Sequence, residues 1–289
     1  MTNSDPGGID PSLAEGGERS GEGAALRRGS VGAAGAGRTV LVTGGSRGIG
    51  AAACRLAAAD GWAVAVNYAR DRAAADAVVA AIVGAGGQAA AFQGDVASDA
   101  EVRAMFAAID AALPPLGGLV NNAGVVDVAA RVEAMSVERL QRMFAINVFG
   151  SFYCAREAIR RMTMKAGAAG PGAHAGGAIV NVSSAAAKLG GPGQYVDYAA
   201  AKGGIETFTI GLAKELAGEG IRVNAVRPGI IDTDIHASGG TPDRVREITP
   251  QLPMKRAGTA DEVGEAIVWL LSERSSYTTG SIVEVTGGR

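Results

Sequence analysis

The feature that most constrains how this chain can fold is a regular alternation of short apolar runs with longer amphipathic segments. The runs are continuously apolar, which is typical of parallel strands covered on both faces. They predict strands at 39–43, 63–67, 89–93, 118–121, 178–183, 221–226 and 282–285, separated by helices at 48–59, 72–83, 100–112, 137–164, 196–217 and 260–271. Repetition at this spacing implies right-handed crossovers, so we expect an α/β fold, one doubly wound parallel sheet of about seven strands with helices on both faces.

The N-terminal stretch differs in composition from the rest of the chain. Residues 1–37 are rich in Gly, Ser, Ala and charged side chains and hold almost nothing to bury, so we expect them to be disordered. The remainder, 38–289, has no internal break and is predicted to form one domain. Within it, 166–177 lacks periodicity and contains Pro171, which indicates a surface loop.

Charge and composition exclude several classes of protein. The formal net charge is −2 and the Lys and Arg residues are scattered, which argues against a nucleic-acid binder. No apolar run reaches the roughly 18 residues of a membrane-spanning helix, and no signal peptide is evident. Cys54 and Cys154 lie in helical patterns without the spacing of a disulfide framework or a metal site. We therefore expect a cytoplasmic protein with neither a metal nor a membrane partner.

A glycine-rich turn, Thr43-Gly44-Gly45-Ser46-Arg47-Gly48-Ile49-Gly50, joins the first predicted strand to the first helix. Glycines in such a turn permit positive φ and let the backbone approach a pyrophosphate, while the helix N-terminus offers free N–H groups. An ordinary glycine-rich turn is the alternative, but the strand–turn–helix setting favours a dinucleotide site. The predicted contacts are Gly44, Ser46, Arg47, Gly48, Ile49 and Gly50.

The end of the second strand bears on which dinucleotide binds. An NAD site usually places an acidic side chain there for the ribose 2′-hydroxyl, whereas this chain reads Val66-Asn67-Tyr68-Ala69-Arg70 before its first carboxylate, Asp71. Arg47 and Arg70 would suit a 2′-phosphate, although either could be a solvated surface charge. We predict that Asn67, Tyr68 and Arg70 contribute to the cofactor site and that NADP(H) is favoured over NAD(H).

Tyr198 and Lys202 are four residues apart in a helical pattern, which places both side chains on one face of the helix. A phenol near its ordinary pKa of about 10 is a poor acid or base at neutral pH. A neighbouring ammonium favours the phenolate, so we expect Lys202 to lower the pKa of Tyr198 and suit it to proton exchange with an alcohol. Taken alone, an ordinary aromatic–basic helix pair is the alternative.

Two further polar positions complete the candidate site. Ser184 closes the strand predicted at 178–183, at the sheet edge where ligands bind, and its hydroxyl could hydrogen-bond a substrate oxygen; Ser183 is the alternative for this role. Asn147 lies inside an apolar helical pattern, where an unpaired carboxamide is costly to bury. A local kink stabilised by water beside Lys202 would explain it.

Together these residues resemble the short-chain dehydrogenase/reductase family over 38–289, and the pattern is most similar to its glucose-dehydrogenase-like and 3-oxoacyl-reductase-like branches. The motifs occur in order: the glycine turn, Asp95-Val96, Asn121-Asn122-Ala123-Gly124, Asn147, Ser184, Tyr198 with Lys202, and Arg227-Pro228-Gly229. One departure is that Ser184 lies fourteen residues before Tyr198, one more than in many members. The resemblance implies a Rossmann-type fold and an enzyme that interconverts a secondary alcohol and a ketone with NAD(P).

The resemblance also implies a role for each residue. It makes Tyr198 the acid/base, Lys202 the residue that binds the nicotinamide ribose and lowers the pKa of the tyrosine, Ser184 the group that orients the carbonyl, and Asn147 the holder of a relay water. It further implies cofactor contacts by Asp95, Val96, Asn121, Tyr198, Lys202, Pro228, Gly229, Ile231 and Thr233.

The segment 232–256, rich in Gly and Pro, is predicted to form a mobile substrate lid, with Ile235, His236 and Met254 lining the pocket.

Homologues commonly form homotetramers, or homodimers, through the helices predicted at 137–164 and 196–217. A non-catalytic dinucleotide-binding sensor on the same fold is the alternative function. The intact set Tyr198, Lys202, Ser184 and Asn147 argues instead for an enzyme acting on a small-molecule alcohol or ketone.

Overall fold

The computed structural model describes residues 35–163, 176–235, 239–241 and 243–289. Nearly all of the stretch predicted to be disordered, and most of the loop predicted at 166–177, therefore lie outside the described residues. The chain divides into two compact units, Met1–Val31 and Gly32–Arg289, and every described residue belongs to the second. The domain boundary predicted at residue 38 stays a prediction.

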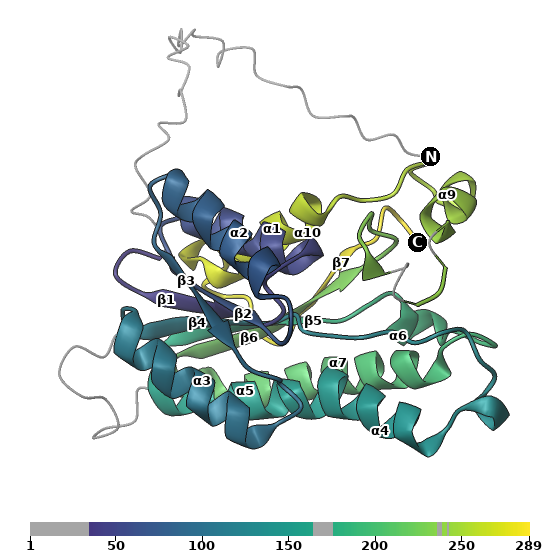
Figure 1. Ribbon diagram of the computed structural model, residues 1–289, viewed down its shortest axis with the longest axis horizontal. Helices are drawn as coiled ribbons and strands as arrows, with labels where there is room; N and C mark the ends of the chain where they lie inside the picture. The colour runs from purple at the N-terminus through teal and green to yellow at the C-terminus, as the bar shows by residue number, and fades with distance from the viewer. Residues whose placement is uncertain (1–34, 164–175, 236–238, 242) are drawn as a thin grey trace, which may run out of the picture. The chain divides into compact units, whose positions relative to one another are not determined.

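The second unit is built on one parallel sheet of seven strands, in the order β3-β2-β1-β4-β5-β6-β7 (Figure 1). The strands are β1 (Thr39–Val42), β2 (Ala63–Tyr68), β3 (Ala89–Gln93), β4 (Leu116–Asn121), β5 (Gly177–Val182), β6 (Ile221–Pro228) and β7 (Ile282–Val285). All seven strands predicted from continuous apolar runs are confirmed. The strand order changes direction at β1, and the chain crosses from β3 to β4 there, which opens a crevice at the C-terminal strand ends.

Helices cover both faces of the sheet, as predicted (Figure 1). One layer comprises α1 (Gly48–Ala59), α2 (Arg72–Gly84) and α10 (Ala260–Leu271), and the other comprises α3 (Asp99–Ala112), α5 (Gly150–Met162) and α7 (Val196–Leu216). Neighbouring side chains of β1 alternate between the two layers. Val40 and Val42 belong to the core beneath the first layer, and Leu41 belongs to the core beneath the second. None of the three has any exposed surface, which explains the unbroken apolar run.

Side-chain caps set the start of several helices. Asp71 and Ser98 each accept a backbone N–H three residues on, at the starts of α2 and α3. Thr259 and Glu262 form a reciprocal capping box at the start of α10. By contrast, α1 begins after Arg47 with no side-chain cap, so its first N–H groups face outward at the glycine turn.

The helix predicted over 137–164 is not continuous, and that prediction is wrong in its middle. It consists of α4 (Val137–Phe144), a π-helical turn at Ala145–Phe149, and α5, which ends at Met162. Asn147 lies in the π-helical turn, and its carboxamide donates a hydrogen bond of 3.0 Å to the Met143 carbonyl oxygen, four residues back. A side chain that bonds the preceding turn competes with the regular backbone ladder.

Several short elements complete the described chain. Two are helices that follow strands: α6 (Ala186–Leu189) after β5, and α9 (Arg244–Ile248) within the predicted lid. Single 3₁₀ turns occupy Val132–Ala134, Ala217–Glu219, Thr249–Gln251 and Glu273–Ser275. No helix in the described ranges combines the length and apolarity needed to cross a membrane.

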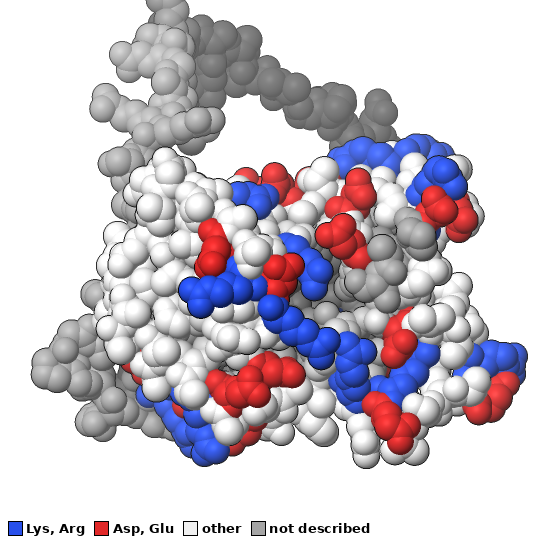
Figure 2. Space-filling model, in the orientation of Figure 1, with Lys and Arg blue, Asp and Glu red and all other residues white. Residues whose placement is uncertain are grey.

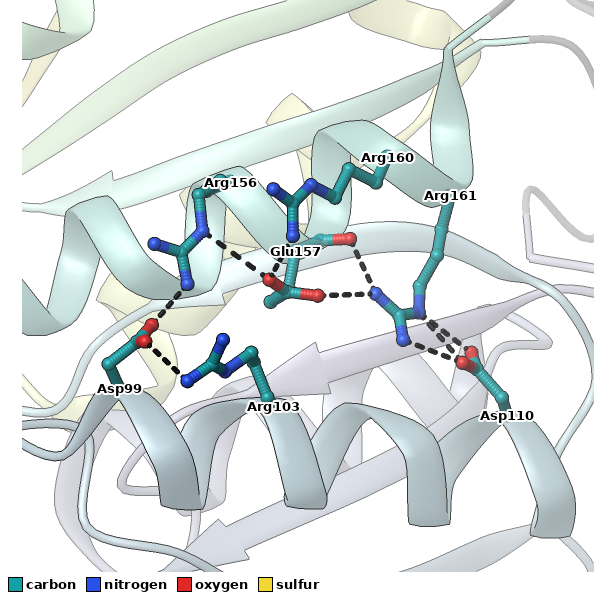
Figure 3. A network of polar contacts seen from close by, with 7 residues as sticks. All are labelled: Asp99, Arg103, Asp110, Arg156, Glu157, Arg160 and Arg161. Atoms are coloured by element: carbon teal, nitrogen blue, oxygen red, sulfur yellow. Dashed lines mark hydrogen bonds and ion pairs between the residues drawn. The ribbon is translucent and has the colours of Figure 1, made fainter. Parts of the chain in front are cut away.

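A network of ion pairs joins α3 to α5 on the surface of the second layer (Figure 3). Its centre is Glu157, a buried carboxylate on α5. Arg161 pairs with Glu157 at 3.1 Å and with Asp110 of α3 at 2.7 Å, so one guanidinium bridges the two helices. Arg156 makes a second bridge, to Glu157 and Asp99. The network therefore links α5 to α3.

Candidate active site

A cavity of about 510 Å³ opens at the C-terminal ends of β4, β5 and β6. Residues far apart in the sequence line it, including Ile49 from the glycine turn, Ser184 after β5, and Tyr198 and Lys202 from α7. The predicted catalytic group and the predicted dinucleotide turn therefore face one space. It lies at the sheet edge where doubly wound folds bind their ligands.

Tyr198 and Lys202 lie on the same face of α7, as their spacing predicted. The Lys202 Nζ is 5.7 Å from the centre of the Tyr198 ring, and the side chains are nearly enclosed, with 9% and 4% of their surface exposed. The Lys202 ammonium donates a hydrogen bond of 2.8 Å to the Val182 carbonyl oxygen at the end of β5. This bond fixes the lysine at the base of the cavity.

The pKa of Tyr198 differs from the expectation. Burial of the phenol raises its pKa to about 12, a hydrogen bond with Ser184 opposes the rise, and the nearby Tyr195 adds to it. Burial also lowers the pKa of Lys202 to about 8. The predicted lowering of the tyrosine pKa by the lysine is not observed. Removing water from both groups outweighs the attraction between them, and the ammonium is directed to the Val182 carbonyl.

The two candidate serines have different surroundings. Ser184 hydrogen-bonds Tyr198, and its Oγ also accepts the Ala186 backbone N–H at 3.2 Å. Ser183 is buried and donates to the Glu206 carboxylate at 2.7 Å. Glu206 in turn pairs with Arg227 on β6. The structure thus brings Ser184, and not Ser183, to the tyrosine hydroxyl.

Asn147 reaches the site through the π-helical turn. Its Nδ2 donates to the Val125 carbonyl oxygen at 3.0 Å, and its Oδ1 accepts the Val125 N–H at 3.2 Å. A Cβ on Gly124 would lie 2.8 Å from the Asn147 Oδ1 and 3.4 Å from the Lys202 Nζ. Only a glycine leaves room where these two polar groups approach each other.

The glycine turn has the conformation its sequence predicted. Gly44 and Gly48 have φ of +61° and +52°, in the left-handed region that favours glycine. A Cβ on Gly50 would lie 2.3 Å from the Gly44 carbonyl oxygen and 2.5 Å from the Asn122 Nδ2. Gly48 also faces Thr233, whose Cγ2 would be 3.4 Å from an added Cβ. The turn therefore packs closely against β4 and against the loop after β6.

The residues predicted at the end of β2 have two kinds of role. Asn67 is buried, and its carboxamide accepts the Gly44 N–H at 3.1 Å and donates to the Gly94 carbonyl oxygen at 3.0 Å, so its side chain braces the glycine turn. Tyr68 is also buried, against α2. Arg47 and Arg70 are exposed, and neither forms an ion pair within the described part of the chain. The Asn67 side chain is therefore already hydrogen-bonded within the protein. The side chains of Arg47 and Arg70 are exposed and could contact a cofactor.

Three other predicted cofactor contacts lie away from the cavity. Asn121 is buried and donates to the Asn181 Oδ1 at 2.9 Å, so its side chain joins β4 to β5 instead of facing a ribose. Val96 is buried against Gly150 of α5. The Asp95 carboxylate accepts the Ala97 N–H at 2.9 Å and is partly exposed.

Sequence reasoning missed Asn122 and Tyr195. The Asn122 carboxamide donates to the carbonyl oxygens of Thr43 and Gly44 at 2.9 and 3.1 Å, and the residue lines the cavity. Tyr195 also lines the cavity, and its ring lies edge-on to that of Tyr198 with centres 6.1 Å apart. Its position three residues before Tyr198 was the available signal for this contact.

The loop after β6 closes the cavity on the lid side. Pro228, Gly229, Ile231 and Thr233 all line it, as does Ile235. Gly229 lies against the Thr286 backbone, where a Cβ would be only 2.8 Å away. Met254 packs against Gly287, and its place in the lining stays a prediction. His236 lies outside the described residues.

Comparison with known proteins agrees with this architecture. Residues 44–289 match the family model described as enoyl-(acyl carrier protein) reductase. The uncharacterized oxidoreductase YgfF of Escherichia coli is 52% identical over 249 residues, covering 86% of this chain and 98% of that protein. The 3beta-hydroxysteroid dehydrogenase 1 of Eggerthella lenta is 40% identical over 261 residues, covering 87% and 93%.

Solved structures give the same result. A short chain dehydrogenase from Burkholderia cenocepacia, in complex with NADP, superposes with a TM-score of 0.78 at 31% identity, covering 88% of this chain and 98% of that one. A dehydrogenase/reductase from Sinorhizobium meliloti has a TM-score of 0.80 at 32% identity, covering 89% and 96%. The fold, the glycine turn, the clustered polar residues and these likenesses lead to one conclusion: the chain belongs to the short-chain dehydrogenase/reductase family and is an oxidoreductase.

Proposed function

We propose that this enzyme is an NADP(H)-dependent oxidoreductase that interconverts a secondary alcohol and a ketone, with Tyr198 as its acid/base. The observation that carries the proposal is the placement of Ser184, Tyr198 and Lys202 in one cavity that the glycine turn also lines, with the Lys202 Nζ 5.7 Å from the centre of the Tyr198 ring. A non-catalytic sensor would have no use for this arrangement of titratable groups.

The residues present fit a dinucleotide. The left-handed Gly44 and Gly48, the uncapped start of α1 and the close approach at Gly50 form a backbone cradle for phosphates. The guanidinium groups of Arg47 and Arg70, which are exposed and form no ion pair with any residue that the structure describes, support a 2′-phosphate and hence NADP(H). A bound nicotinamide would supply the hydride chemistry, for which the protein provides orientation and electrostatics.

The chain's own residues would handle the substrate oxygen and its proton. Ser184 would donate a hydrogen bond to the carbonyl oxygen, while the Tyr198 hydroxyl would release its proton to that oxygen as the alcohol forms. A pKa of about 12 keeps Tyr198 protonated at neutral pH, the form in which it can donate a proton to a substrate oxygen. The Lys202 ammonium and Asn147, which both lie close to Gly124, would hold the water through which Tyr198 is reprotonated.

The test is Tyr198→Phe. The variant should lose at least 10³-fold in NADPH-dependent reduction of a panel of ketones, of the order seen when a general acid is removed. It should keep its affinity for NADPH, measured by fluorescence titration. Tyr277→Phe is the control, because this tyrosine is exposed and does not line the cavity. Undiminished turnover in Tyr198→Phe would refute the proposal.

The cofactor preference has a separate test. Arg47→Ala should weaken NADPH binding by roughly 10-fold or more and leave NADH binding nearly unchanged, since only NADPH carries the 2′-phosphate. The control is Arg55→Ala, at an exposed arginine that pairs with Asp261 and lies in α1, the helix that follows Arg47. Equal weakening of both nucleotides would assign Arg47 to the pyrophosphate or to structure.

We also propose a homotetrameric assembly through α4, α5 and α7. Phe149 and Phe152 support it, because each exposes about half of its surface beside α7, where Phe152 stacks on Phe208. The buried free thiols of Cys54 and Cys154 suit a cytoplasmic location.

A further inference from the structure

Two arginines line the cavity that holds Tyr198, and neither has a carboxylate partner within the described ranges of the chain. Arg244 comes from α9, and Arg289 follows β7. Arg244 thus belongs to the predicted lid segment. Both charges line the same cavity as the proposed acid, Tyr198.

Arg289 carries an unsatisfied donor. Its Nη1 nitrogen is buried and has no hydrogen-bond partner. A buried donor of a charged group that lacks an acceptor is costly, because it loses its hydration without replacement. Such a group at the wall of a cavity is satisfied when an acceptor enters that cavity.

Arg244 is held in place by neutral groups. It hydrogen-bonds the Tyr195 hydroxyl and, at 2.9 Å, the Gln194 side-chain oxygen, and it lies 5.1 Å from the centre of the Tyr195 ring. These contacts orient the guanidinium without neutralising it. Because Tyr195 packs edge-on against Tyr198, the charge has a defined position relative to the proposed acid.

Other arginines near Arg244 do have carboxylate partners within the described residues. On the same short helix Arg246 pairs with Asp243 at 3.1 Å, and after it Arg256 pairs with Glu262 at 2.6 Å. Figure 2 shows side chains of both charges, Lys and Arg as well as Asp and Glu, around the hollow on this face. Two carboxylates, Asp127 and Glu247, also line the cavity, against three cations, Lys202, Arg244 and Arg289. From α9 and the residues that follow β7, two guanidinium groups and one carboxylate, Glu247, line the cavity.

From these observations we propose that the substrate ketone carries a carboxylate, which Arg289 binds together with Arg244. A planar guanidinium matches a carboxylate with two parallel hydrogen bonds, and such charge-assisted bonds are about twice as strong as neutral ones. The substrate class is thus an oxo acid and its hydroxy-acid product. This inference rests on the proposed reductase function, since it names the substrate of the same site.

The experiment compares straight-chain oxo acids of increasing length with their uncharged methyl esters, under NADPH. The series is needed because the carbonyl must reach Tyr198 while the carboxylate reaches Arg289. At the best length, we expect kcat/KM for the acid to exceed that for its ester by roughly 10-fold or more. Arg289→Met should abolish this preference, chiefly by raising KM for the acid, and Arg289→Lys should retain part of it. Arg246→Met, on the outer side of α9, is the control that should keep the full preference.

The outcomes separate this inference from the proposed function. Reduction of esters and acids at equal rates, or an unchanged preference in Arg289→Met, would overturn the carboxylate inference and leave the reductase standing. Absence of turnover with every ketone would refute the reductase itself. Calorimetric titration of a non-reducible carboxylate, pentanoate, into the NADP⁺ complex gives a second readout, and Arg289→Met should abolish its binding. If Arg289→Met weakened NADPH binding instead, the arginine would belong to the cofactor and the inference would fall.

Discussion

The Arg139 guanidinium donates two hydrogen bonds, of 2.8 and 3.2 Å, to the carboxylate of Asp197, the residue directly before Tyr198. Neither member of the pair is open to solvent, since their side chains expose 11% and 0% of their surface. Arg139 also donates to the Val128 carbonyl oxygen at 2.6 Å. One ion pair therefore ties α4 and the segment after β4 to the first turn of α7, where the proposed acid lies.

Removing the arginine from this pair should unfold the protein more easily. Arg139→Met leaves the Asp197 carboxylate buried without a partner, and we expect a loss of about 3–5 kcal/mol in the free energy of unfolding. Urea denaturation followed by circular dichroism measures it. Arg131→Met, which breaks an exposed pair with Glu133, is the control and should change stability by less than about 1 kcal/mol. Adding Asp197→Asn to Arg139→Met should restore part of the loss; no restoration would mean that the charge is not the cause.

Ketone reduction should decline as the pH rises through about 8. The pKa of Lys202 is lowered to about 8, so its ammonium, present below that pH, is lost above it, whereas Tyr198 with a pKa of about 12 stays protonated throughout. The kcat/KM profile from pH 6 to 10 checks this. In Lys202→Arg, which cannot lose its charge in this range, the descending limb should vanish even if the rate is lower. A wild-type profile that stays flat to pH 10 would contradict the assignment.

The same lysine should reduce stability at neutral pH. Because its folded pKa lies below its ordinary value of 10.5, the folded state binds fewer protons than the unfolded state between about pH 8 and 10.5, and stability rises with pH across that window. Lys202→Met removes the buried charge but leaves the Val182 carbonyl without its donor. We expect a net gain of about 1–2 kcal/mol at pH 7 that shrinks by pH 10.5, seen as a higher Tm in calorimetry. A lower Tm at pH 7 would show that the hydrogen bond outweighs the charge.

A single methyl group should disable the glycine turn. In Gly50→Ala the new Cβ would overlap the Gly44 carbonyl oxygen and the Asn122 carboxamide, so the turn must open. NADPH affinity, measured by fluorescence titration, should fall by roughly 10-fold or more because the pyrophosphate loses its backbone donors. Gly211→Ala is the matched control: its Cβ meets open space on α7, and alanine should stabilise that helix by up to about 1 kcal/mol without affecting NADPH. Comparable loss in both variants would point to general unfolding.

The layered fold could be predicted from the sequence because buried parallel strands must be apolar on both faces. β1 illustrates this, with Val40 and Leu41 directed to opposite cores. The π-helical turn could not be predicted from periodicity, because a single inserted residue barely disturbs the apolar pattern of 137–164. Asn147, a polar residue in an apolar pattern, indicated where the helix is irregular but not that the irregularity is a π-helical turn.

The sequence predicted which residues lie near the site more reliably than it predicted where their side chains point. Tyr198, Lys202 and Ser184 meet in one cavity, as their order along the strands and helix suggested. The side chains of Asn67 and Asn121 turn into the sheet instead, because only the folded structure shows which of two adjacent asparagines, Asn121 or Asn122, faces the ligand edge. The tyrosine pKa was mispredicted because burial, which sequence spacing does not reveal, outweighs the nearby charge.

The commitment of Asn67 to Gly44 and Gly94 has a consequence for how this enzyme can diversify. Its carboxamide belongs to the scaffold, whereas the two positions that follow β2, Ala69 and Arg70, are exposed and brace nothing through their side chains. Substitutions at these two positions should therefore leave the hydrogen bonds that Asn67 makes to the glycine turn intact. Asp71, which caps α2, marks where that freedom ends.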